Sequence, residues 1–299
     1  MKGKIIKGVG GFYYIHVADG RLFECKAKGG FRNQGMKPAV GDDVSMEILD
    51  EAALLGHVVS INERKNKLLR PTVANVDQAM IIFALADPKP NLNLLDRFLI
   101  RMQCEHIPTI ICFNKSDLVD SSEADKLKQI YENCGYEVLV TTTSYCMDAS
   151  SNESIEVVFD LLKGKTTVLA GPSGVGKSSM LNALMKEDAV KTGSISEKIK
   201  RGKHTTRHSE LICICEDTYI MDTPGFSSLF IEEIEEAEDL KDYYPEFEPY
   251  NGMCRFAGCV HDKEPDCAVK KAVEDGKISS LRYENYIQLY EERKNKRKW

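Results

Sequence analysis

The chain has 299 residues, a formal net charge of -6, 42% hydrophobic residues and 29% charged residues. This composition is that of a globular protein and excludes the disordered and fibrous classes, and the length predicts two or three domains. No run approaches the roughly 20 apolar residues that cross a bilayer, and the N-terminal residues lack the apolar stretch of a signal peptide. A soluble, cytoplasmic protein without membrane contact is therefore expected.

Residues 1–70 predict a small β-barrel, because short β-type runs alternate there with glycine-containing turns. The segment carries twelve Lys/Arg and eight Asp/Glu, so it is net +4 while the remainder of the chain is net -10. A positively charged barrel of the OB type binds RNA on one strand face and its loops; the alternative is an adaptor barrel without RNA contacts. The runs that predict strands are Phe12–Val17, Arg21–Cys25, Asp43–Ile48 and His57–Ile61.

Over residues 71–230 the pattern changes to apolar strands that alternate with longer helical segments, which is typical of a mostly parallel α/β sheet. Ligands of such sheets bind beyond the carboxyl ends of the strands, and polar motifs follow three of the strands here. The predicted strands are Ala79–Ala84, Thr109–Phe113, Val138–Thr141, Thr167–Ala170 and Tyr219–Asp222, and the predicted helices include Leu92–Cys104 and Ser178–Met185.

A phosphate-binding loop is predicted at residues 171–178, where the pattern G-x-x-x-x-G-K-S follows a strand and opens a helix. Its glycines let backbone amides curl around a β-phosphate, Lys177 should reach the β- and γ-phosphates, and the Ser178 hydroxyl should bind Mg²⁺. The alternative is a plain glycine-rich turn. The predicted nucleotide contacts are Gly171, Pro172, Ser173, Gly174, Val175, Gly176, Lys177, Ser178 and Ser179.

A second motif, Asn114, Lys115, Ser116 and Asp117, predicts that the base is guanine. The Asp117 carboxylate can accept hydrogen bonds from N1-H and the N2 amino group of guanine, whereas adenine presents no such pair of donors. Asn114 would tie this loop to the phosphate loop, and the Lys115 stem would cover the base. For Ser116 and Asp117, an N-terminal helix cap is the alternative.

Further contacts to the nucleotide are predicted from three short segments. Thr143 and Ser144, which follow another strand, could supply a backbone contact to the guanine oxygen. Asp222, at the end of a strand, would hold Mg²⁺ through a water, and the Gly225 amide would donate to the γ-phosphate. The polar segment 201–207 is predicted to be a switch. In it Thr205 or Thr206 would complete the Mg²⁺ shell, with Thr205 slightly preferred.

The order of these motifs differs from that of a Ras-like GTPase, in which the phosphate loop comes first. Here Asn114–Asp117 precedes the loop at Gly171–Ser178. Joining the original termini and opening an exposed loop preserves a site that spatial geometry defines. We therefore expect a circularly permuted GTPase domain over residues 71–230.

A cysteine cluster predicts a metal centre in residues 231–299. Three thiolates and one imidazole lie within fourteen residues, enough to fill a tetrahedral zinc ion with no open position, which is the pattern of a structural site. The spacing is not that of a common zinc finger, so reduced cysteines are the alternative. The predicted zinc ligands are Cys254, Cys259, His261 and Cys267.

A helix is predicted over 278–298, ending in a basic tail that either contacts phosphates or keeps the protein soluble.

Together, the permuted order, the N-terminal barrel, the segment Gly202-Lys-His-Thr-Thr206 and the cysteine cluster resemble the ribosome-small-subunit-dependent GTPase A family, also called RsgA or YjeQ. The resemblance covers essentially the whole chain. It implies an OB-type barrel that binds RNA, a circularly permuted P-loop GTPase domain and a helical zinc-binding domain. It also implies GTP hydrolysis with Mg²⁺ during late maturation of the small (30S) ribosomal subunit, stimulated by that subunit and its rRNA.

Catalysis by this chain is expected to depend on its partner. Phe226 stands where Ras-like enzymes carry the glutamine that orients water, so slow intrinsic turnover is predicted. The resemblance points to His204 as the residue that positions or deprotonates the water, and an exposed loop histidine is the alternative. The family usually has arginine where Lys203 stands.

Two other functions remain open on the sequence. The chain could be an RNA-binding module gated by GTP or GDP in which hydrolysis is incidental, and turnover in the presence of small subunits would discriminate this from an enzyme. The phosphate loop alone also fits a guanylate kinase, but that class does not need the Asn114–Asp117 motif. A monomer is expected.

Overall fold

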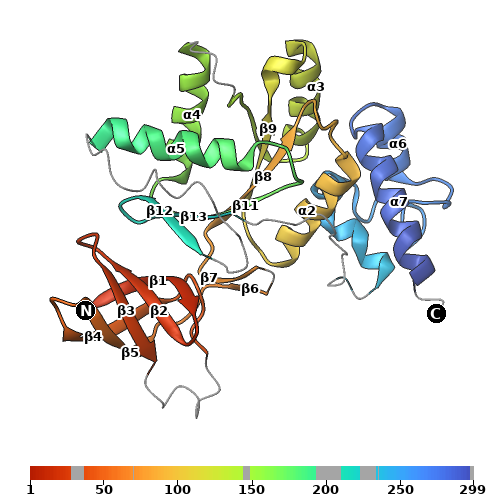
Figure 1. The fold of residues 1–299 in the computed structure, drawn as a ribbon. Coiled ribbons are helices and arrows are strands. Elements are labelled where there is room, and N and C mark those ends of the chain that lie inside the picture. Colours follow the sequence, from red (N-terminus) through yellow and green to blue (C-terminus); the bar gives the residue numbers. More distant parts are fainter. Residues whose placement is uncertain are drawn as a thin grey trace.

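The computed structural model describes residues 1–27, 37–69, 71–143, 149–192, 210–222, 234 and 236–296, without the side chains of 149–153, 187–192 and 296. The described residues form three parts in a row, with the N-terminal barrel at one end, an α/β sheet in the middle and a helical part at the other end (Figure 1). The two chain termini lie at opposite ends of the molecule. Among the described residues, no helix is both long and apolar enough to cross a membrane.

The N-terminal part is a closed barrel with the strand order β1-β2-β3-β5-β4. Strand β1 pairs antiparallel with β2 and β4, and β3 pairs parallel with β5, which is the arrangement of an OB-type barrel. Alternate side chains point inward and are fully buried, among them Ile5, Ile15 and Phe23. The strands are β1 (Lys2–Val9), β2 (Phe12–Val17), β3 (Leu22–Ala27), β4 (Asp43–Asp50) and β5 (Leu55–Ile61).

Strand β1 is not among the runs that the sequence pattern identifies. Its sequence, KGKIIKGV, has two adjacent isoleucines between lysines and glycines, and its register shifts between Ile5 and Lys7. This irregularity interrupts the alternation of inward and outward residues, so the run does not have the pattern of a regular strand.

The central sheet has the order β10-β9-β8-β11-β13-β12. Its strands run parallel except for β12, which pairs antiparallel with β13 at one edge. The predicted strands are all present, with bounds that differ by one residue, and β12 is an additional one. The strands are β8 (Gln78–Ala84), β9 (Thr109–Asn114), β10 (Glu137–Val140), β11 (Thr166–Ala170), β12 (Leu211–Cys215) and β13 (Thr218–Asp222); β6 (Lys67–Leu69) and β7 (Thr72–Ala74) form a separate small ribbon.

Helices cover both faces of the central sheet, as expected for a mostly parallel sheet. In the fully buried strand β8, Ile81 and Phe83 pack with α2 (Leu92–Cys104) and α3 (Ser121–Glu132), and the alternate residues pack with α4 (Ala149–Leu162) and α5 (Lys177–Thr192). Helix α2 has the predicted bounds, because its apolar residues recur at helical spacing and the Asn91 side chain accepts from the Leu94 amide at 3.0 Å.

The C-terminal part contains 3-10 helices at Ala237–Tyr243 and Pro245–Tyr250, followed by α6 (Ala268–Glu274) and α7 (Ser280–Lys296). Its core is aromatic: the rings of Phe247 and Tyr286 lie 5.0 Å apart and those of Tyr244 and Tyr286 lie 5.2 Å apart, both edge to face. This small core packs around the cysteine cluster, since Cys259 and Cys267 belong to the same buried group.

A buried ionic network joins the C-terminal part to the central sheet. The Arg282 guanidinium of α7 donates to Glu246 (2.7 and 3.2 Å) and contacts the carboxylate of Asp96 on α2. Asp96 also accepts from Asn285 (2.7 Å) and from the Tyr131 hydroxyl (3.1 Å). The Arg282 and Asp96 side chains are only 1% and 0% exposed, so this junction is desolvated and held in one geometry.

Candidate functional site

The loop between β11 and α5 can be made only with glycine at certain positions. Gly171 has φ +139°, and a Cβ there would lie 2.1 Å from the Ile82 carbonyl oxygen. Gly176 has φ +99°, and a Cβ there would lie 2.2 Å from Nδ2 of Asn114. Both conformations and both approaches exclude other residues, so the backbone of this loop lies directly against β8 and β9.

Lys177 lies at the start of α5, and its side chain turns back over the loop. Its Nζ donates to the carbonyl oxygens of Gly171 (2.7 Å) and Pro172 (2.6 Å). Burial lowers the pKa of Lys177, and the carboxylate of Asp222 at the end of β13 opposes that change. A helix N-terminus, an ammonium group and a nearby carboxylate are therefore gathered at one edge of the sheet, which suits a phosphate with a bound cation.

The remaining loop residues divide between solvent and core. Ser173, Gly174, Ser178 and Ser179 are exposed, whereas Val175 is buried in the core under α5. The loop is thus anchored by one apolar side chain while its polar groups face outward.

Asn114, the last residue of β9, is fully buried and connects two loops. Its Nδ2 donates to the Val175 carbonyl oxygen (2.9 Å) and lies 3.3 Å from Thr143 Oγ1, while its Oδ1 accepts from Thr141 Oγ1 (3.1 Å). Residues 114–117 and the loop after β11 are therefore joined through one side chain, although they lie about sixty positions apart in the chain.

The residues after Asn114 form a short segment that is half-buried at Lys115 and Ser116 and exposed at Asp117. Lys115 has φ +62°, and its Nζ contacts the Asp87 carbonyl oxygen. Ser116 and Asp117 begin a 3-10 helix, Ser116–Leu118, that has no side-chain cap, so the helix-cap alternative does not describe this segment. The Asp117 carboxylate is exposed, and its Oδ1 accepts from Thr142 Oγ1 at 2.6 Å.

Thr142 is the residue that sequence reasoning missed in this site. Its hydroxyl donates to Asp117, a role that the sequence pattern did not assign, while Thr143, predicted to supply a backbone contact to the guanine oxygen, lies against Asn114. The run of threonines at 141–143 after β10 was the available signal. Ser144, His204, Thr205, Thr206 and Gly225 lie outside the described residues.

A second candidate site lies in the C-terminal part, where Cys254, Cys259, His261 and Cys267 converge. Their ligand atoms all lie within 4.8 Å of one another and could hold a metal ion. Sγ of Cys254 and Cys267 are 3.8 Å apart, and Nδ1 of His261 is 3.3 to 3.6 Å from the three sulfurs. Metal bonds of about 2.3 Å to sulfur and about 2.0 Å to nitrogen give tetrahedron edges of roughly 3.8 and 3.5 Å, so the four atoms fit a tetrahedral ion.

The surroundings of this cluster favour the metal-binding form of the imidazole, whereas burial raises the pKa of the Cys259 thiol to about 12 and also raises that of Cys267. Each sulfur accepts a backbone N–H: Cys254 from Ala268 (3.4 Å), Cys259 from His261 (3.4 Å) and Cys267 from Lys270 (3.5 Å). Burial, then the positive charge of Lys241, lowers the pKa of His261 to about 4, and Glu264 opposes this. The imidazole is therefore neutral near pH 7, with its Nδ1 available to an ion.

Two family models match the chain. The one described as RsgA GTPase matches residues 61–232, and the one described as RsgA N-terminal domain matches residues 2–53. The first range contains both loops that Asn114 joins, and the second contains most of the barrel.

Named relatives and solved structures agree with these matches. The chain is 53% identical to the small ribosomal subunit biogenesis GTPase RsgA of Agathobacter rectalis and 47% identical to that of Clostridium botulinum, over the whole of each chain. The crystal structure of YloQ, a circularly permuted GTPase, matches with a TM-score of 0.78 at 36% identity, covering 99% of this chain and 95% of that one. YjeQ from Thermotoga maritima matches with a TM-score of 0.79 at 34% identity, covering 97% of each.

Proposed function

Because this chain belongs to the RsgA GTPase family and is thus a GTP-hydrolysing enzyme, we propose that it acts in late maturation of the small ribosomal subunit, which stimulates its hydrolysis. The hydrogen bond from Asn114 to the Val175 carbonyl carries the nucleotide part of this proposal, because it holds the guanine-reading loop against the phosphate loop. The relatives' names supply the ribosomal part. A cytoplasmic location and a monomeric chain follow as parts of the proposal.

Each described loop then has a role toward GTP. Asp117 reads the guanine edge, and the Lys115 stem covers the base. The backbone N–H groups of Gly171 and residues 173–176 and the Lys177 ammonium would cradle the phosphates, while Ser178 and Asp222 would hold Mg²⁺. Mg²⁺ when bound would neutralise charge that develops on the phosphates. Family membership leaves no support for the guanylate kinase alternative.

The first prediction concerns Gly176. Gly176→Ala should weaken GTP binding by at least about tenfold, because its Cβ would displace the Asn114 amide that joins the loops. Gly135→Ala is the matched control: φ is also positive there (+85°), but no described atom lies within 4 Å of its Cβ, so it carries the backbone strain alone. Calorimetric titration with GTP measures both. Equal affinities in the two variants would contradict the assigned contact.

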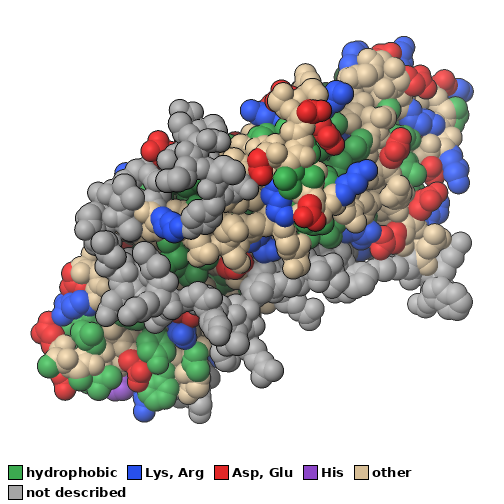
Figure 2. All heavy atoms as spheres, turned by 45° about the horizontal axis from the view of Figure 1, so that its top comes forward, with side chains coloured by type: hydrophobic (Ala, Val, Ile, Leu, Met, Phe, Trp, Pro, Cys, Tyr) green, Lys and Arg blue, Asp and Glu red, His purple; other side chains and the backbone are tan. Residues whose placement is uncertain are grey.

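We assign RNA recognition to the barrel. On the face shown in Figure 2, Lys/Arg and Asp/Glu side chains are intermingled over the described surface, so this part of the surface has no broad positively charged patch. On the barrel, Lys26 of β3 is paired with Phe12 of β2, and its Nζ lies 4.7 Å from the ring centroid. The Lys26 ammonium lies over one face of this ring, so a base would stack on the opposite face while the lysine neutralises a phosphate.

The catalytic proposal is that His204 positions the attacking water. His204→Ala should lose about 10²-fold or more of the hydrolysis rate measured with small subunits, since general-base groups contribute about 10² to 10⁴, while keeping GTP affinity. His208→Ala, four residues further along, is the control. Hydrolysis is measured with and without purified small subunits at two salt concentrations, because contacts to rRNA phosphates weaken with salt. If small subunits left the hydrolysis rate of the wild-type protein unchanged, the ribosomal role would be refuted.

The metal of the C-terminal part is proposed to be one structural zinc ion, since three thiolates and an imidazole in a closed tetrahedron leave no position for substrate. Cys267→Ser should lose the bound zinc and lower the unfolding temperature of the C-terminal part, while GTP affinity stays unchanged. Metal content by atomic emission, with circular dichroism on heating, measures this. Cys104→Ser, a half-buried thiol outside the cluster, is the control. Retention of one zinc per chain by the Cys267 variant would show the ligand set to be wrong.

A further inference from the structure

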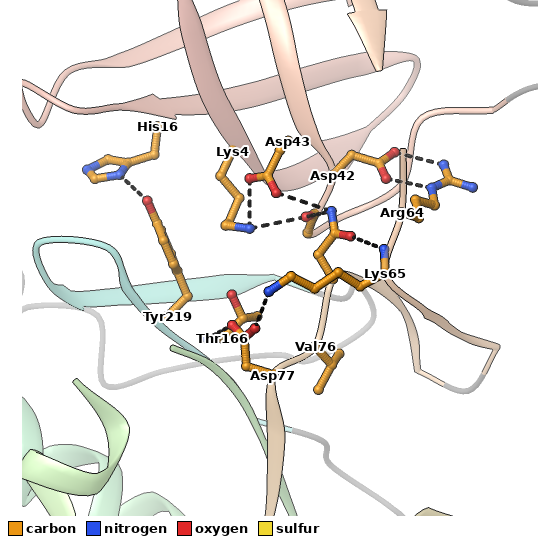
Figure 3. Close-up of polar contacts among 12 residues, drawn as sticks. Lys4, His16, Asp42, Asp43, Arg64, Lys65, Val76, Asp77, Thr166 and Tyr219 are labelled. Atoms are coloured by element: carbon orange, nitrogen blue, oxygen red, sulfur yellow. Dashed lines mark hydrogen bonds and ion pairs between the residues drawn. The ribbon is translucent and has the colours of Figure 1, made fainter. Parts of the chain in front are cut away.

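The barrel touches the central sheet through the hairpin formed by β12 and β13. His16 Nδ1 of β2 lies 2.8 Å from the Tyr219 hydroxyl of β13, and the two rings meet edge to face at 5.7 Å (Figure 3). Lys7 of β1 forms an ion pair with Glu210 at 3.0 Å, and the two residues also form an isolated antiparallel bridge just before β12. These contacts join positions 203 residues apart in the chain.

A second connection runs through the linker between the barrel and the sheet, which comprises residues 62–77. The buried Asp42 carboxylate accepts from Arg64 at 2.6 and 2.8 Å, and the Lys65 ammonium lies 2.7 Å from Asp77 (Figure 3). Asp77 in turn accepts from the amide of Thr166 at the start of β11. The linker is therefore fixed to the barrel by a bidentate arginine pair and to the sheet by Asp77.

Between these two connections the barrel packs against the central part in part, through Ile6 of β1 and Val40, which lie against the core that includes Leu211 and Tyr219. A cleft of about 340 Å³ lies there, with Lys2, His16 and Asp43 on the barrel side and Asp217 and Tyr219 on the hairpin side. Polar contacts beside open space allow small rotations that a packed apolar interface would resist. A tilt of the barrel about the linker would therefore be limited by the contacts of Tyr219 and Glu210.

The hairpin also leads to the nucleotide site. Tyr219 and Asp222 lie three residues apart on β13, roughly 10 Å along a strand. Strand β13 is paired on one side with β11, which runs into the phosphate loop, and on the other side with β12. Because a strand with hydrogen-bonded neighbours on both sides moves as a unit, a displacement at Asp222 is carried to Tyr219.

We propose that the β12–β13 hairpin couples the nucleotide site to the barrel, with His16–Tyr219 and Lys7–Glu210 acting as a latch that sets the barrel's orientation. This coupling rests on the proposed function, in which the barrel binds rRNA. GTP and GDP then favour different barrel orientations, and by reciprocity RNA held on the barrel alters the state of the nucleotide site.

The first test uses the isolated full-length chain. Hydrogen–deuterium exchange over residues 2–17 is compared with GDP and with a non-hydrolysable GTP analogue. Wild type should show an exchange difference of about threefold or more between the two nucleotides, and Glu210→Lys and Tyr219→Phe should reduce it to less than half. The swap Lys7→Glu with Glu210→Lys should restore it, which a general loss of stability would not do. Equal exchange with both nucleotides in wild type would overturn the coupling.

The second test adds purified small subunits. Glu210→Lys and Tyr219→Phe should lower the stimulated hydrolysis rate about three- to tenfold, within the usual range of coupling between sites, while basal hydrolysis is unchanged. Glu132→Lys, which reverses an exposed charge on α3, should behave as wild type. Stimulation that is equal in wild type and both latch variants would refute the latch. Absence of stimulation in wild type would refute the ribosomal role, leaving the exchange experiment to decide the coupling.

Discussion

Asp117→Asn is expected to weaken GTP binding by about 10² to 10⁴-fold, which is the largest effect of any single substitution considered. The carboxylate would accept two hydrogen bonds from the guanine edge, and each hydrogen bond to a charged group contributes about 1.5 to 3 kcal/mol. In the variant an amide N–H would face a guanine N–H donor. Thr142 would still donate to the remaining oxygen, so the orientation of the side chain is kept and the chemistry alone changes.

The same variant should gain affinity for xanthosine triphosphate. Xanthine carries a carbonyl at C2 where guanine carries an amino group, so the new amide finds an acceptor there. Titration with GTP, xanthosine triphosphate and ATP measures the change in nucleotide specificity. Asp125→Asn, on an exposed position of α3, is the matched control and should bind GTP as the wild type does. If Asp117→Asn bound GTP as tightly as the wild type does, Asp117 would not be part of the guanine site.

Arg282→Met is expected to destabilise the C-terminal part by about 3 to 5 kcal/mol, because it leaves two buried carboxylates without their cation. Burial raises the pKa of Asp96, and the charge and hydrogen bonds of Arg282 and Asn285 oppose that rise. Without the guanidinium, Asp96 either stays charged in a dry site or takes up a proton and loses part of its hydrogen bonding. Both outcomes weaken the attachment of α7 to α2.

Urea unfolding followed by circular dichroism measures this change, with the first transition expected at lower urea in the variant. The control is Arg255→Met, which breaks an ion pair with Asp266 in which both side chains are 66% exposed. Such a pair contributes about 1 kcal/mol or less. If the two variants unfolded at the same urea concentration, the buried network would contribute no more than a surface pair.

The two junctions of the central sheet therefore differ in kind. The C-terminal part is held to α2 by groups that are almost fully buried, whereas the barrel meets the β12–β13 hairpin through half-buried polar groups and a small apolar contact, with a cleft beside them. Disruption of the first should lower stability, and disruption of the second should alter coupling with a smaller loss of stability. Variants of the Arg282 network and variants of the latch can therefore be told apart by measuring stability and coupling.

The sequence by itself determined the features that depend on neighbouring residues. The bounds of α2 follow from apolar side chains at helical spacing after the cap at Asn91. The loop at Gly171–Lys177 is recognisable because close backbone approach and positive φ require glycine at set positions. The cysteine cluster is likewise short enough for its spacing to predict a common metal site. In each case the residues that are subject to the physical constraint lie within about twenty positions of one another, so the constraint is visible as a pattern in the sequence.

The tertiary structure alone decided the contacts between distant segments. The residues around Arg282 give no local sign that its side chain is buried, and it is buried because Asp96, 186 positions earlier, supplies the opposing charge. Thr142 donates to Asp117 because β10 lies beside β9, which brings together the residues that follow the two strands. The His16–Tyr219 contact has no local pattern at all. Burial of a charge and pairing of polar groups depend on what the fold brings opposite them, and a single segment of sequence does not contain that information.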